Sequence, residues 1–326
     1  MSGLSWGLIG AGDIVRKRVA AALREGTGCD LVAISRARAE LAEPFAREVG
    51  ARRWFPSWRD LVADPEIEAV YVATPVRFHA EQTIAAAAAG KHVLCEKPMA
   101  MDVAECDRMI AACQAAGVTL GIAYYRRFYP IVARVKQLID AGDIGTLVFV
   151  QMTAFEPFDP RPGEPRSWLL QRSEAGGGPM ADFGCHRLEV LLHLAGPVGR
   201  VTSLVSTIAL KREVEDTAVA LLQFERGASG VLAVTHAAAD SQDTLDLFGT
   251  KGSIRVRSLA GGEMIVRVGG VERSESHPPG RNVHTPLVED FAEAVQAGRA
   301  PAVDGHVGRA VAAIQDAIYA VPPPIR

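Results

Sequence analysis

The stretch His92-Val93-Leu94-Cys95-Glu96-Lys97-Pro98-Met99 places a short apolar run before a charged pair and a proline. Proline has no backbone N–H, holds its own φ at about −65° and pushes the preceding residue toward an extended conformation. The sequence therefore predicts a β-strand over residues 92–95 that stops at Lys97. In an open parallel sheet, ligands bind beyond the carboxyl ends of the strands. Lys97 is placed for chemistry if such a sheet is present, although an isolated Glu-Lys-Pro more often carries a solvated lysine.

Strands and helices alternate around this stretch. Apolar runs predict strands at residues 4–9, 31–34, 69–73 and 118–123, and apolar residues at helical spacing predict helices at residues 15–23, 39–48, 58–62, 79–89 and 102–116. Such regular alternation is typical of a parallel sheet with right-handed crossovers. Residues 1–123 are therefore predicted to form a doubly wound α/β domain, a Rossmann domain that binds a dinucleotide. These strands supply the parallel sheet on which the proposed role of Lys97 depends.

A glycine turn joins the first predicted strand to the first predicted helix. In Gly10-Ala11-Gly12-Asp13-Ile14, Gly10 permits a tight turn and Gly12 lets a pyrophosphate approach the backbone. The N–H groups and the dipole at the N-terminus of the following helix favour that anion. Val15 stands where a third glycine is usual, so the motif alone is weak. Its position between a strand and a helix nevertheless predicts a cofactor cradle that includes Asp13 and Ile14.

The residues after the second predicted strand bear on the choice of cofactor. Ser35, Arg36 and Arg38 lie where a site that prefers NAD would carry an acidic residue for the ribose hydroxyls. A hydroxyl with arginines suits the 2′-phosphate of NADP, because a guanidinium pairs with phosphate through two hydrogen bonds. The sequence therefore predicts NADP rather than NAD, with solvated loop arginines as the alternative interpretation. Thr74, which follows the next strand, is expected at the edge of the cofactor.

Composition limits the classes of function. The chain has 326 residues, enough for two domains, and 35 basic against 38 acidic residues give a net charge of −3. This balance provides no electrostatic attraction to nucleic acids or acidic membranes, so neither is an expected partner. Apolar runs stay below the roughly 18 residues that span a bilayer, and the N-terminus does not resemble a signal peptide. The five cysteines are scattered without a Cys-x-x-Cys pair, which favours reduced thiols and a cytoplasmic protein.

The pattern changes at residue 124, and residues 124–326 are predicted to form a second, α/β domain that binds substrate and mediates assembly. Helices are expected over 130–141, 286–297 and 306–320, and strands over 147–155, 201–210, 217–224, 230–235, 244–248, 253–256 and 264–268. Turn signals between several of these strands indicate a large, mainly antiparallel open sheet. Helices can cover one face of such a sheet and a second copy of the chain the other. We therefore predict a homodimer or homotetramer built through the sheet.

The long segment at residues 155–173 is expected to be a loop suited to covering a site. Arg161, Arg166 and Arg172 within it hint at an acidic or phosphorylated substrate, although loop arginines are usually solvated. Three glycines at residues 176–178 follow, and a helix is predicted from there through residue 194.

Asp182 and His186 lie four residues apart on that helix, which puts both on one face. A lone histidine near apolar residues is more often hydrogen-bonded in a core. An aspartate one turn earlier, behind three glycines, favours a catalytic acid–base pair instead. Glu189 and His193 extend the same stripe. Because four ligands from one helix cannot converge tetrahedrally on one ion, an ordinary polar stripe is favoured over a metal site.

In this order, the motifs resemble those of the Gfo/Idh/MocA family of NAD(P)-dependent oxidoreductases, named after glucose-fructose oxidoreductase and inositol dehydrogenase. The matching segments are residues 10–14, 73–75 with His79, 90–98, and 176–178 with Asp182 and His186. The likeness extends over nearly the whole chain. It implies a Rossmann domain followed by an α/β domain with an open sheet, and a catalytic set formed by Lys97, Asp182 and His186.

The resemblance also implies further site residues. The cofactor site is expected to include Thr74, Pro75, His79, Glu96 and Lys97. Trp168 matches a family position near the substrate, and Tyr125 or Arg126 is expected to reach it as well, beside the three catalytic residues. Members of the dihydrodiol and xylose dehydrogenase type carry tyrosine where His186 stands, so this chain looks more like the sugar and inositol branch.

The implied reaction is a reversible conversion between an alcohol and a ketone on a sugar, inositol or related polyol, with hydride exchanged with NAD(P). His186 would exchange the hydroxyl proton, Lys97 would stabilise charge on the reacting oxygen, and Asp182 would hold a neighbouring hydroxyl or orient the histidine. A non-catalytic NAD(P)-binding regulator of the same fold is the alternative function, which the presence of all three residues disfavours. A metal-dependent hydrolase is a third and weaker hypothesis.

Overall fold

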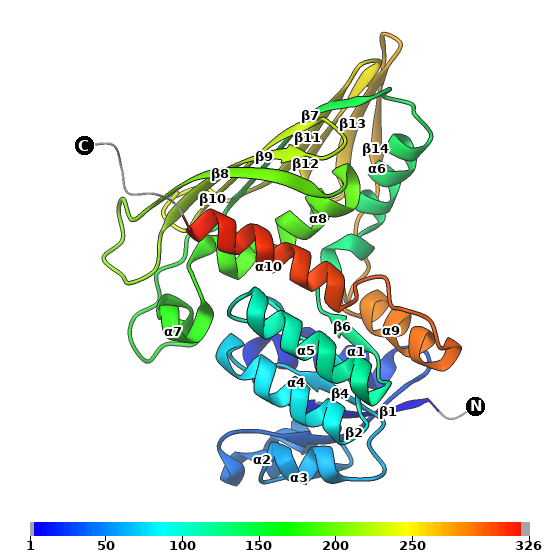
Figure 1. Ribbon diagram of the computed structural model, residues 1–326, viewed down its shortest axis with the longest axis vertical. Coiled ribbons are helices and arrows are strands. Elements are labelled where there is room, and N and C mark those ends of the chain that lie inside the picture. The colour runs from blue at the N-terminus through cyan, green and yellow to red at the C-terminus, as the bar shows by residue number, and fades with distance from the viewer. Residues whose placement is uncertain (1–2, 321–326) are drawn as a thin grey trace. The chain divides into compact units, whose positions relative to one another are not determined.

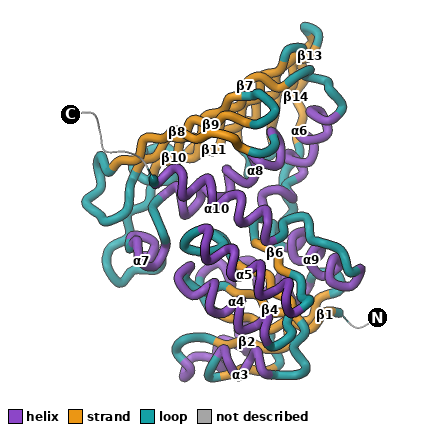
Figure 2. Tube along the Cα trace, viewed as in Figure 1, coloured by secondary structure: helices purple, strands orange, loops and turns teal. Residues whose placement is uncertain are grey.

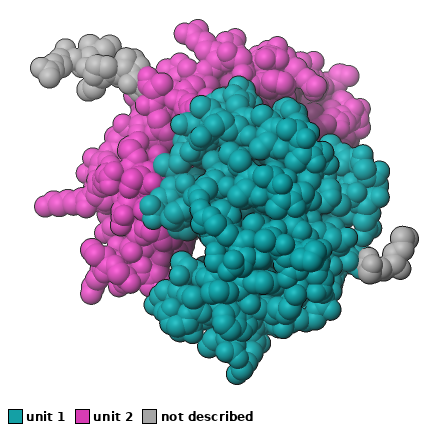
Figure 3. All heavy atoms as spheres, turned by 60° about the horizontal axis from the view of Figure 1, so that its bottom comes forward, with its two compact units in different colours: residues 1–125, 282–309 teal, residues 126–281, 310–326 magenta. Residues whose placement is uncertain are grey.

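The computed structural model describes residues 3–320. The chain divides into two compact units: unit 1 comprises Met1–Tyr125 and Asn282–Arg309, and unit 2 comprises Arg126–Arg281 and Ala310–Arg326 (Figure 3). The boundary predicted from the sequence lay between residues 123 and 124. The structure differs in one main respect, because the segment from residue 282 to residue 309 packs with unit 1 although the prediction grouped it with the second domain.

Unit 1 is built on a parallel sheet with the strand order β3-β2-β1-β4-β5-β6, of which Figure 1 labels β1, β2, β4 and β6. Its strands are β1 Leu4–Ile9, β2 Cys29–Ser35, β3 Arg53–Phe55, β4 Ala69–Val72, β5 His92–Cys95 and β6 Leu120–Ile122. This is the order of a doubly wound Rossmann sheet, which confirms the predicted fold, and β5 has the predicted bounds. The prediction missed β3, because three residues are too short a run for strand periodicity to appear.

Helices connect successive strands of this sheet. They are α1 Ala20–Glu25, α2 Ala42–Val49, α3 Trp58–Ala63, α4 His79–Ala88 and α5 Val103–Ala116, with short 3-10 turns at Ala39–Leu41 and Val76–Phe78 and a π-helical turn at Val15–Val19 that leads into α1. Asp102 caps α5 as predicted, since its side chain accepts the backbone N–H of Glu105 at 2.8 Å. Right-handed crossovers place α1 and α2 on one face of the sheet and α3, α4 and α5 on the other.

A helix from the C-terminal part of the chain completes unit 1. In α9, Thr285–Ala297, the side chain of Phe291 is fully buried, and its ring centroid lies 5.4 Å from that of Trp6 in β1. Gly121 in β6 makes room for this phenylalanine, because a Cβ at residue 121 would lie 2.7 Å from its ring. The sheet thus presents an apolar surface that a distant segment covers, which explains why the segment returns to unit 1.

Unit 2 contains an open sheet, seen as the upper group of orange strands in Figure 2. Its strand order is β14-β13-β12-β11-β7-β10-β9-β8. Its strands are β7 Leu147–Phe155, β8 Val198–Ser206, β9 Thr217–Phe224, β10 Ser229–Thr235, β11 Gln242–Gly249, β12 Gly252–Ser258, β13 Glu263–Val268 and β14 Val271–Ser276. Neighbouring strands run antiparallel except β7 and β10, which run parallel. The predicted mainly antiparallel open sheet is therefore confirmed.

Two strands of unit 2 differ from the prediction. Strand β8 ends at Ser206 rather than at Leu210, because the carboxylate of Asp216 accepts the backbone N–H groups of Ile208, Ala209 and Leu210 and turns the chain there. Strand β14 was not predicted. It is an edge strand of mostly exposed residues, so it carries no apolar alternation that a sequence pattern can reveal.

The remaining helices lie largely in unit 2. They are α6 Pro130–Asp140, α7 Arg172–Ala175, α8 Cys185–Ala195 and α10 Gly305–Tyr319, with 3-10 turns at Tyr125–Phe128 and Ser167–Leu170 and a π-helical turn at Met180–Gly184 before α8. Helix α6 packs against α8, and α8 packs against β7. The segment over residues 155–173, predicted to be a loop, contains the 3-10 turn Ser167–Leu170 and the start of α7. Within residues 3–320, the helices are too short or too polar to cross a membrane.

A buried ion pair joins α8 to the segment that precedes α6. Glu189 is fully buried, and the Arg127 guanidinium donates to its Oε1 at 2.5 Å. Burial raises the pKa of Glu189 to about 7, against the opposing charge and hydrogen bond of Arg127. Burial, followed by the charge of Arg127, lowers the pKa of His193 to about 4. The ordinary polar stripe favoured by the sequence therefore includes a buried carboxylate, Glu189, whose partner Arg127 lies outside the stripe.

The raised pKa of Glu189 makes the stability of the protein depend on pH. The ordinary value is 4.5 and the folded value is about 7, so the folded state binds the proton more tightly and the free energy of unfolding falls as the pH rises through this window. Over this pH window, we expect the free energy of unfolding of Glu189→Gln, which resembles the protonated acid, to fall by at least about 1 kcal/mol less than that of the wild type. Urea unfolding at a series of pH values measures it, with the exposed Glu263→Gln as control. An unchanged pH dependence in Glu189→Gln would contradict the assignment.

Candidate active site

The ends of three neighbouring strands lie at one edge of the parallel sheet. Ile9 pairs with Val72, and Val72 pairs with Cys95, so the last residues of β1, β4 and β5 are level with one another. The glycine turn after β1 and Lys97 after β5 therefore leave the sheet at the same edge. This is the edge at which doubly wound sheets bind their ligands.

Two glycines after β1 fit a dinucleotide for different reasons. Gly10 has a φ of +111°, and a Cβ there would lie 2.4 Å from the carbonyl oxygen of Ala73, so the turn requires glycine. A Cβ at Gly12 would meet nothing within 4 Å. Gly12 thus faces open space through which a pyrophosphate can approach the start of the helical run. Asp13 and Ile14 follow directly, and Ile14 is the N-cap of that run.

The residues predicted to select the cofactor lie at the end of β2. The Ser35 carbonyl accepts the N–H of the first turn glycine at 2.9 Å, which ties β2 to the glycine turn. The Arg36 guanidinium lies 5.3 Å from the centroid of the Phe45 ring and donates to the Leu41 carbonyl at 3.3 Å. Burial lowers the pKa of Arg36, and the charge of Arg38 lowers it further. The side chain of Arg38 is exposed.

A buried histidine ties the end of β4 to the end of β5. Nδ1 of His79 lies 2.9 Å from the carbonyl oxygen of Pro98, and Nε2 lies 2.9 Å from the carbonyl oxygen of Thr74. Burial lowers the pKa of His79, although these carbonyls favour its protonated form. The Thr74 hydroxyl donates to Oε1 of Gln82 at 2.7 Å, and Pro75 precedes the next 3-10 turn as its N-cap. His79 therefore braces the strand ends, and its contact with a cofactor stays a prediction.

Lys97 follows a buried carboxylate. Glu96 is 7% exposed, its Oε1 accepts the Tyr71 hydroxyl at 2.8 Å, and its Oε2 accepts the backbone N–H of Lys97 at 3.2 Å. Nε2 of His284 lies 3.7 Å from the same Oε1. Burial raises the pKa of this carboxyl, but His284, Lys97 and Tyr71 together hold it below the ordinary value. A charged carboxylate therefore lies next to the predicted catalytic lysine.

Two of the three glycines before Asp182 are required by close packing in unit 2. A Cβ at Gly178 would lie 2.1 Å from the backbone oxygen of Glu215, and a Cβ at Gly177 would lie 2.0 Å from the Tyr319 hydroxyl. The buried Glu215 carboxylate accepts the N–H of Gly178 at 2.8 Å and the hydroxyl of Tyr319 at 2.8 Å. Both partners were missed from the sequence, because they come from distant segments. The run of glycines was the one local sign of a close approach.

Asp182 and His186 are both buried in unit 2, at 7% and 3% exposed. Asp182 comes from the π-helical turn, and His186 comes from the first turn of α8. Oδ2 of Asp182 accepts the Arg166 guanidinium at 3.0 Å and lies 3.7 Å from Nε2 of His236. His236 was not selected from the sequence, because it follows β10 as an isolated histidine without a motif around it.

Arg166 adopts a backbone conformation that is rare for a residue other than glycine. Its φ is +69°, in the left-handed region, which costs on the order of 1–3 kcal/mol. Its guanidinium lies 4.5 Å from the centroid of the Phe158 ring, 3.6 Å from Glu156 and in contact with the Asp182 carboxylate. This arginine of the 155–173 segment is therefore held against the predicted catalytic aspartate rather than being only solvated.

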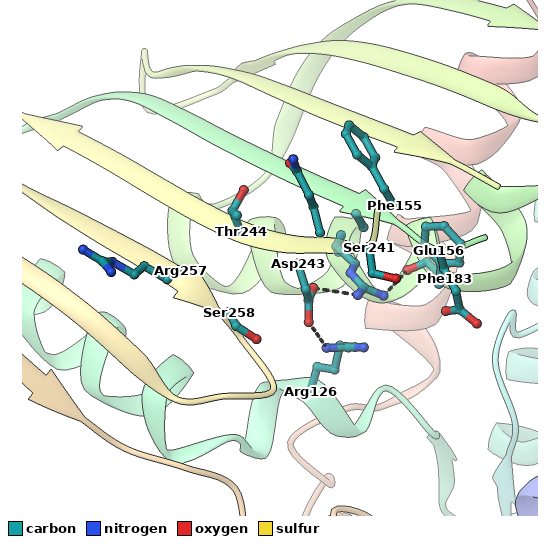
Figure 4. Close-up of a pocket in the computed structure, with 12 residues that line it drawn as sticks. Arg126, Phe155, Glu156, Phe183, Ser241, Asp243, Thr244, Arg257 and Ser258 are labelled. Atoms are coloured by element: carbon teal, nitrogen blue, oxygen red, sulfur yellow. Dashed lines mark hydrogen bonds and ion pairs between the residues drawn. The ribbon is translucent and has the colours of Figure 1, made fainter. Parts of the chain in front are cut away.

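A cavity of about 600 Å³ lies in unit 2, where β7, β11 and β12 come together (Figure 4). Asp243 faces it and binds two arginines, Arg126 through Oδ2 at 3.0 Å and Arg187 through Oδ1 at 2.6 Å. Burial raises the pKa of this aspartate, but the two guanidinium groups hold it below the ordinary value. The cavity is also lined by Ala154, Phe155, Glu156, Phe183, Ser241, Gln242, Thr244, Arg257 and Ser258. Arg126 was selected from the sequence, whereas Arg187 and Asp243 were not.

The two aromatic residues predicted near the substrate have different surroundings. Tyr125 is buried in unit 1, where its ring centroid lies 4.4 Å from that of His284 and its hydroxyl accepts Arg18 at 3.4 Å. Trp168 lies partly exposed in the 3-10 turn Ser167–Leu170 of unit 2. Their contacts with a substrate stay predictions.

The chain matches two protein-family models. Residues 4–124 match the model described as an oxidoreductase family with an NAD-binding Rossmann fold, GFO_IDH_MocA. Residues 132–255 match the GFO/IDH/MocA C-terminal domain. The two matches follow each other in the order of the two predicted domains.

Individual relatives extend this comparison. 1,5-Anhydro-D-fructose reductase of Ensifer adhaerens is 35% identical over 259 residues, 78% of this chain and 76% of the relative. Levoglucosan dehydrogenase of Pseudarthrobacter phenanthrenivorans is 32% identical over 246 residues, 68% of this chain and 63% of the relative. Myo-inositol 2-dehydrogenase of Thermotoga maritima is 27% identical over 290 residues, 86% and 84% of the two chains. A solved structure of levoglucosan dehydrogenase with NADH and levoglucosan has a TM-score of 0.90 at 28% identity, covering 98% of this chain and 96% of that chain.

Proposed function

This chain belongs to the Gfo/Idh/MocA family of oxidoreductases, and on that premise we propose that it transfers a hydride between a nicotinamide cofactor and a CH–OH or C=O carbon of a sugar, inositol or related polyol. Relatives named for anhydrofructose, levoglucosan and inositol support this substrate class. The observation that carries the proposal is the position of Lys97, directly beyond β5 at the edge that also holds the glycine turn.

The three predicted catalytic residues have distinct roles in this proposal. The nicotinamide, when bound, accepts or donates the hydride. His186 accepts the hydroxyl proton when the alcohol is oxidised and returns it when the ketone is reduced, a contribution typically worth about 10² to 10⁴ in rate. The ammonium of Lys97 donates a hydrogen bond to the reacting oxygen and stabilises the negative charge that develops there.

Asp182 is proposed to hold a neighbouring substrate hydroxyl or to orient the histidine. Its carboxylate is bound by Arg166 in the structure. A carboxylate has about four lone-pair sites, so it can accept a substrate hydroxyl while the arginine stays bound. Arg166 then holds the Asp182 carboxylate in one direction, which is what recognition of a hydroxyl requires.

The catalytic assignment is tested by two substitutions after a substrate has been found. A cofactor-linked absorbance screen over sugars, inositols, sugar acids and their keto forms identifies that substrate. We expect His186→Ala and Lys97→Ala each to lower kcat/KM by about 10² or more, because one removes the proton acceptor and the other the donor to the reacting oxygen.

Exposed residues of the same types serve as matched controls. Lys251→Ala and His306→Ala remove a lysine and a histidine from exposed positions and are expected to leave kcat/KM unchanged. Full turnover in Lys97→Ala or His186→Ala would show that the assignment is wrong. Binding of cofactor without turnover of any compound in the screen would instead favour the regulator of the same fold.

NADP is proposed as the preferred cofactor. Arg36 and Arg38 at the end of β2 support this choice, since guanidinium groups pair well with a 2′-phosphate. A guanidinium has five N–H donors, so Arg36 can bind phosphate while it keeps its bond to the Leu41 carbonyl. The solved structure of levoglucosan dehydrogenase contains NADH, so a preference for NADH over NADPH is the competing outcome.

The cofactor proposal is tested by fluorescence titration with NADPH and NADH. We expect tighter binding of NADPH, and we expect Arg36→Ala to weaken it by about 10- to 100-fold, because a hydrogen bond to a charged group is worth about 1.5–3 kcal/mol. NADH affinity is expected to change little. Arg47→Ala on the exposed side of α2 is the control. A clear preference of the wild type for NADH would overturn the proposal.

Assembly through the open sheet of unit 2 is proposed as well. Leu204 in β8 is 73% exposed and Leu221 in β9 is 53% exposed. Leu204 pairs with Val219, two residues before Leu221, so both leucines lie on one face of the sheet. Ala220 and Leu222, which alternate with Leu221, are buried on the opposite face. A second copy of the chain can cover the exposed leucines in a homodimer or homotetramer.

Light scattering coupled to size-exclusion chromatography tests the proposed assembly. The wild type is expected to elute as a dimer or tetramer. Leu204→Arg with Leu221→Arg is expected to give a monomer, because two buried guanidinium groups would lack partners in the interface. Ile208→Arg, at a position 74% exposed beyond the end of β8, is the control. A monomeric wild type would contradict the proposal.

A further inference from the structure

A histidine from the returning segment of unit 1 is buried beside Glu96. The Asn282 side chain accepts the backbone N–H of His284 at 3.0 Å and donates to the Arg18 carbonyl at 2.9 Å, which fixes the segment before α9. His284 is 0% exposed, and its ring centroid lies 4.4 Å from that of Tyr125. Among residues 3–320, neither ring nitrogen has a hydrogen-bond partner. A buried imidazole in this situation requires an explanation.

The Glu96 carboxylate faces this imidazole. Its Oε1 lies 3.7 Å from Nε2 of His284. The Tyr71 hydroxyl binds the same oxygen, and the backbone N–H of Lys97 binds the other. Both of these donors are neutral groups, whereas a buried carboxylate also needs a positive charge nearby to offset the loss of its hydration.

The charged and titratable groups around the pair come from several elements. They are Tyr71 in β4, Glu96 and Lys97 after β5, Tyr125 before α6, Arg18 in the π-helical turn and His79 in α4. The Arg18 guanidinium donates to the Tyr125 hydroxyl, and both ring nitrogens of His79 lie against backbone carbonyls. Two groups therefore compete to balance Glu96, namely the imidazole of His284 and the ammonium of Lys97.

We propose that His284 is a positioning residue that acts on Lys97 through Glu96. The imidazole, with Nε2 3.7 Å from Oε1 of Glu96, offsets the charge of the buried carboxylate, so that Glu96 does not draw the ammonium of Lys97 away from the reacting oxygen of the substrate. Without the imidazole, the carboxylate either draws the ammonium toward itself or takes up a proton and weakens its bond to the Lys97 N–H. Either change moves the lysine from its working position. The inference rests on the proposed function, because it takes Lys97 as catalytic.

A set of three variants tests the inference: His284→Gln, Glu96→Gln and the double variant. We expect His284→Gln to lower kcat by about tenfold or more with little change in KM, as for loss of an interaction made in the transition state. The double variant is expected to recover most of this loss, because the Glu96→Gln change keeps the shape of the side chain and leaves no charge to balance. His306→Gln, exposed on α10, is expected to behave like the wild type.

Each outcome of the experiment decides the inference. Unchanged kcat in His284→Gln overturns it. A double variant no faster than His284→Gln also overturns it, because a merely structural histidine would not be rescued by removal of the neighbouring charge. If the wild type turns over no substrate, the proposed function fails separately, and urea unfolding of the same variants then tests the pair. Additive effects on the unfolding midpoint overturn the pairing, and non-additive effects support it.

Discussion

The level alignment of β1, β4 and β5 is the constraint on which the candidate site of unit 1 depends. A shift of one residue in this parallel register would move Lys97 along the sheet edge relative to the glycine turn and would turn alternate side chains to the other face. Backbone bonds hold the alignment, since the N–H of Ala73 donates to Ile9 and the N–H of Glu96 donates to Val72. His79 also links the loops that follow β4 and β5, because its two ring nitrogens contact the carbonyl oxygens of Thr74 and Pro98. The lysine therefore owes its position to several strands rather than to its own motif.

A second feature is that charged side chains lie next to candidate residues of both units or hold the segments that carry them. Glu96 lies next to Lys97, Arg166 binds Asp182, and Glu215 fastens the glycines that precede Asp182. Buried carboxylates cost free energy unless they are paired, and here Glu96 and Glu215 accept hydrogen bonds from the backbone of Lys97 and Gly178. A substrate with several hydroxyl groups, as proposed for this chain, requires donors and acceptors that are fixed in direction.

Local signals in the sequence sufficed where one residue imposes a conformation. Pro98 marks the end of β5, Asp102 marks the start of α5, and Gly10 marks the turn after β1. The prediction grouped residues 282–309 with the second domain, because the contacts of α9 with β1 and β6 come from hydrophobic packing between segments far apart in the sequence. His284 and Glu215 were missed for the same reason: neither belongs to a motif, and only folding brings them to the residues that they support. Edge strand β14 left no apolar pattern to detect.

The most direct test of hydride transfer follows the hydrogen itself. Once a substrate is known, it is labelled with deuterium at the carbinol carbon, oxidised by the enzyme with the nicotinamide cofactor, and the reduced cofactor is analysed by mass spectrometry. Direct transfer predicts that the deuterium appears in the reduced nicotinamide, because the hydride does not exchange with water. Appearance of the label in solvent, with none in the cofactor, would contradict the account.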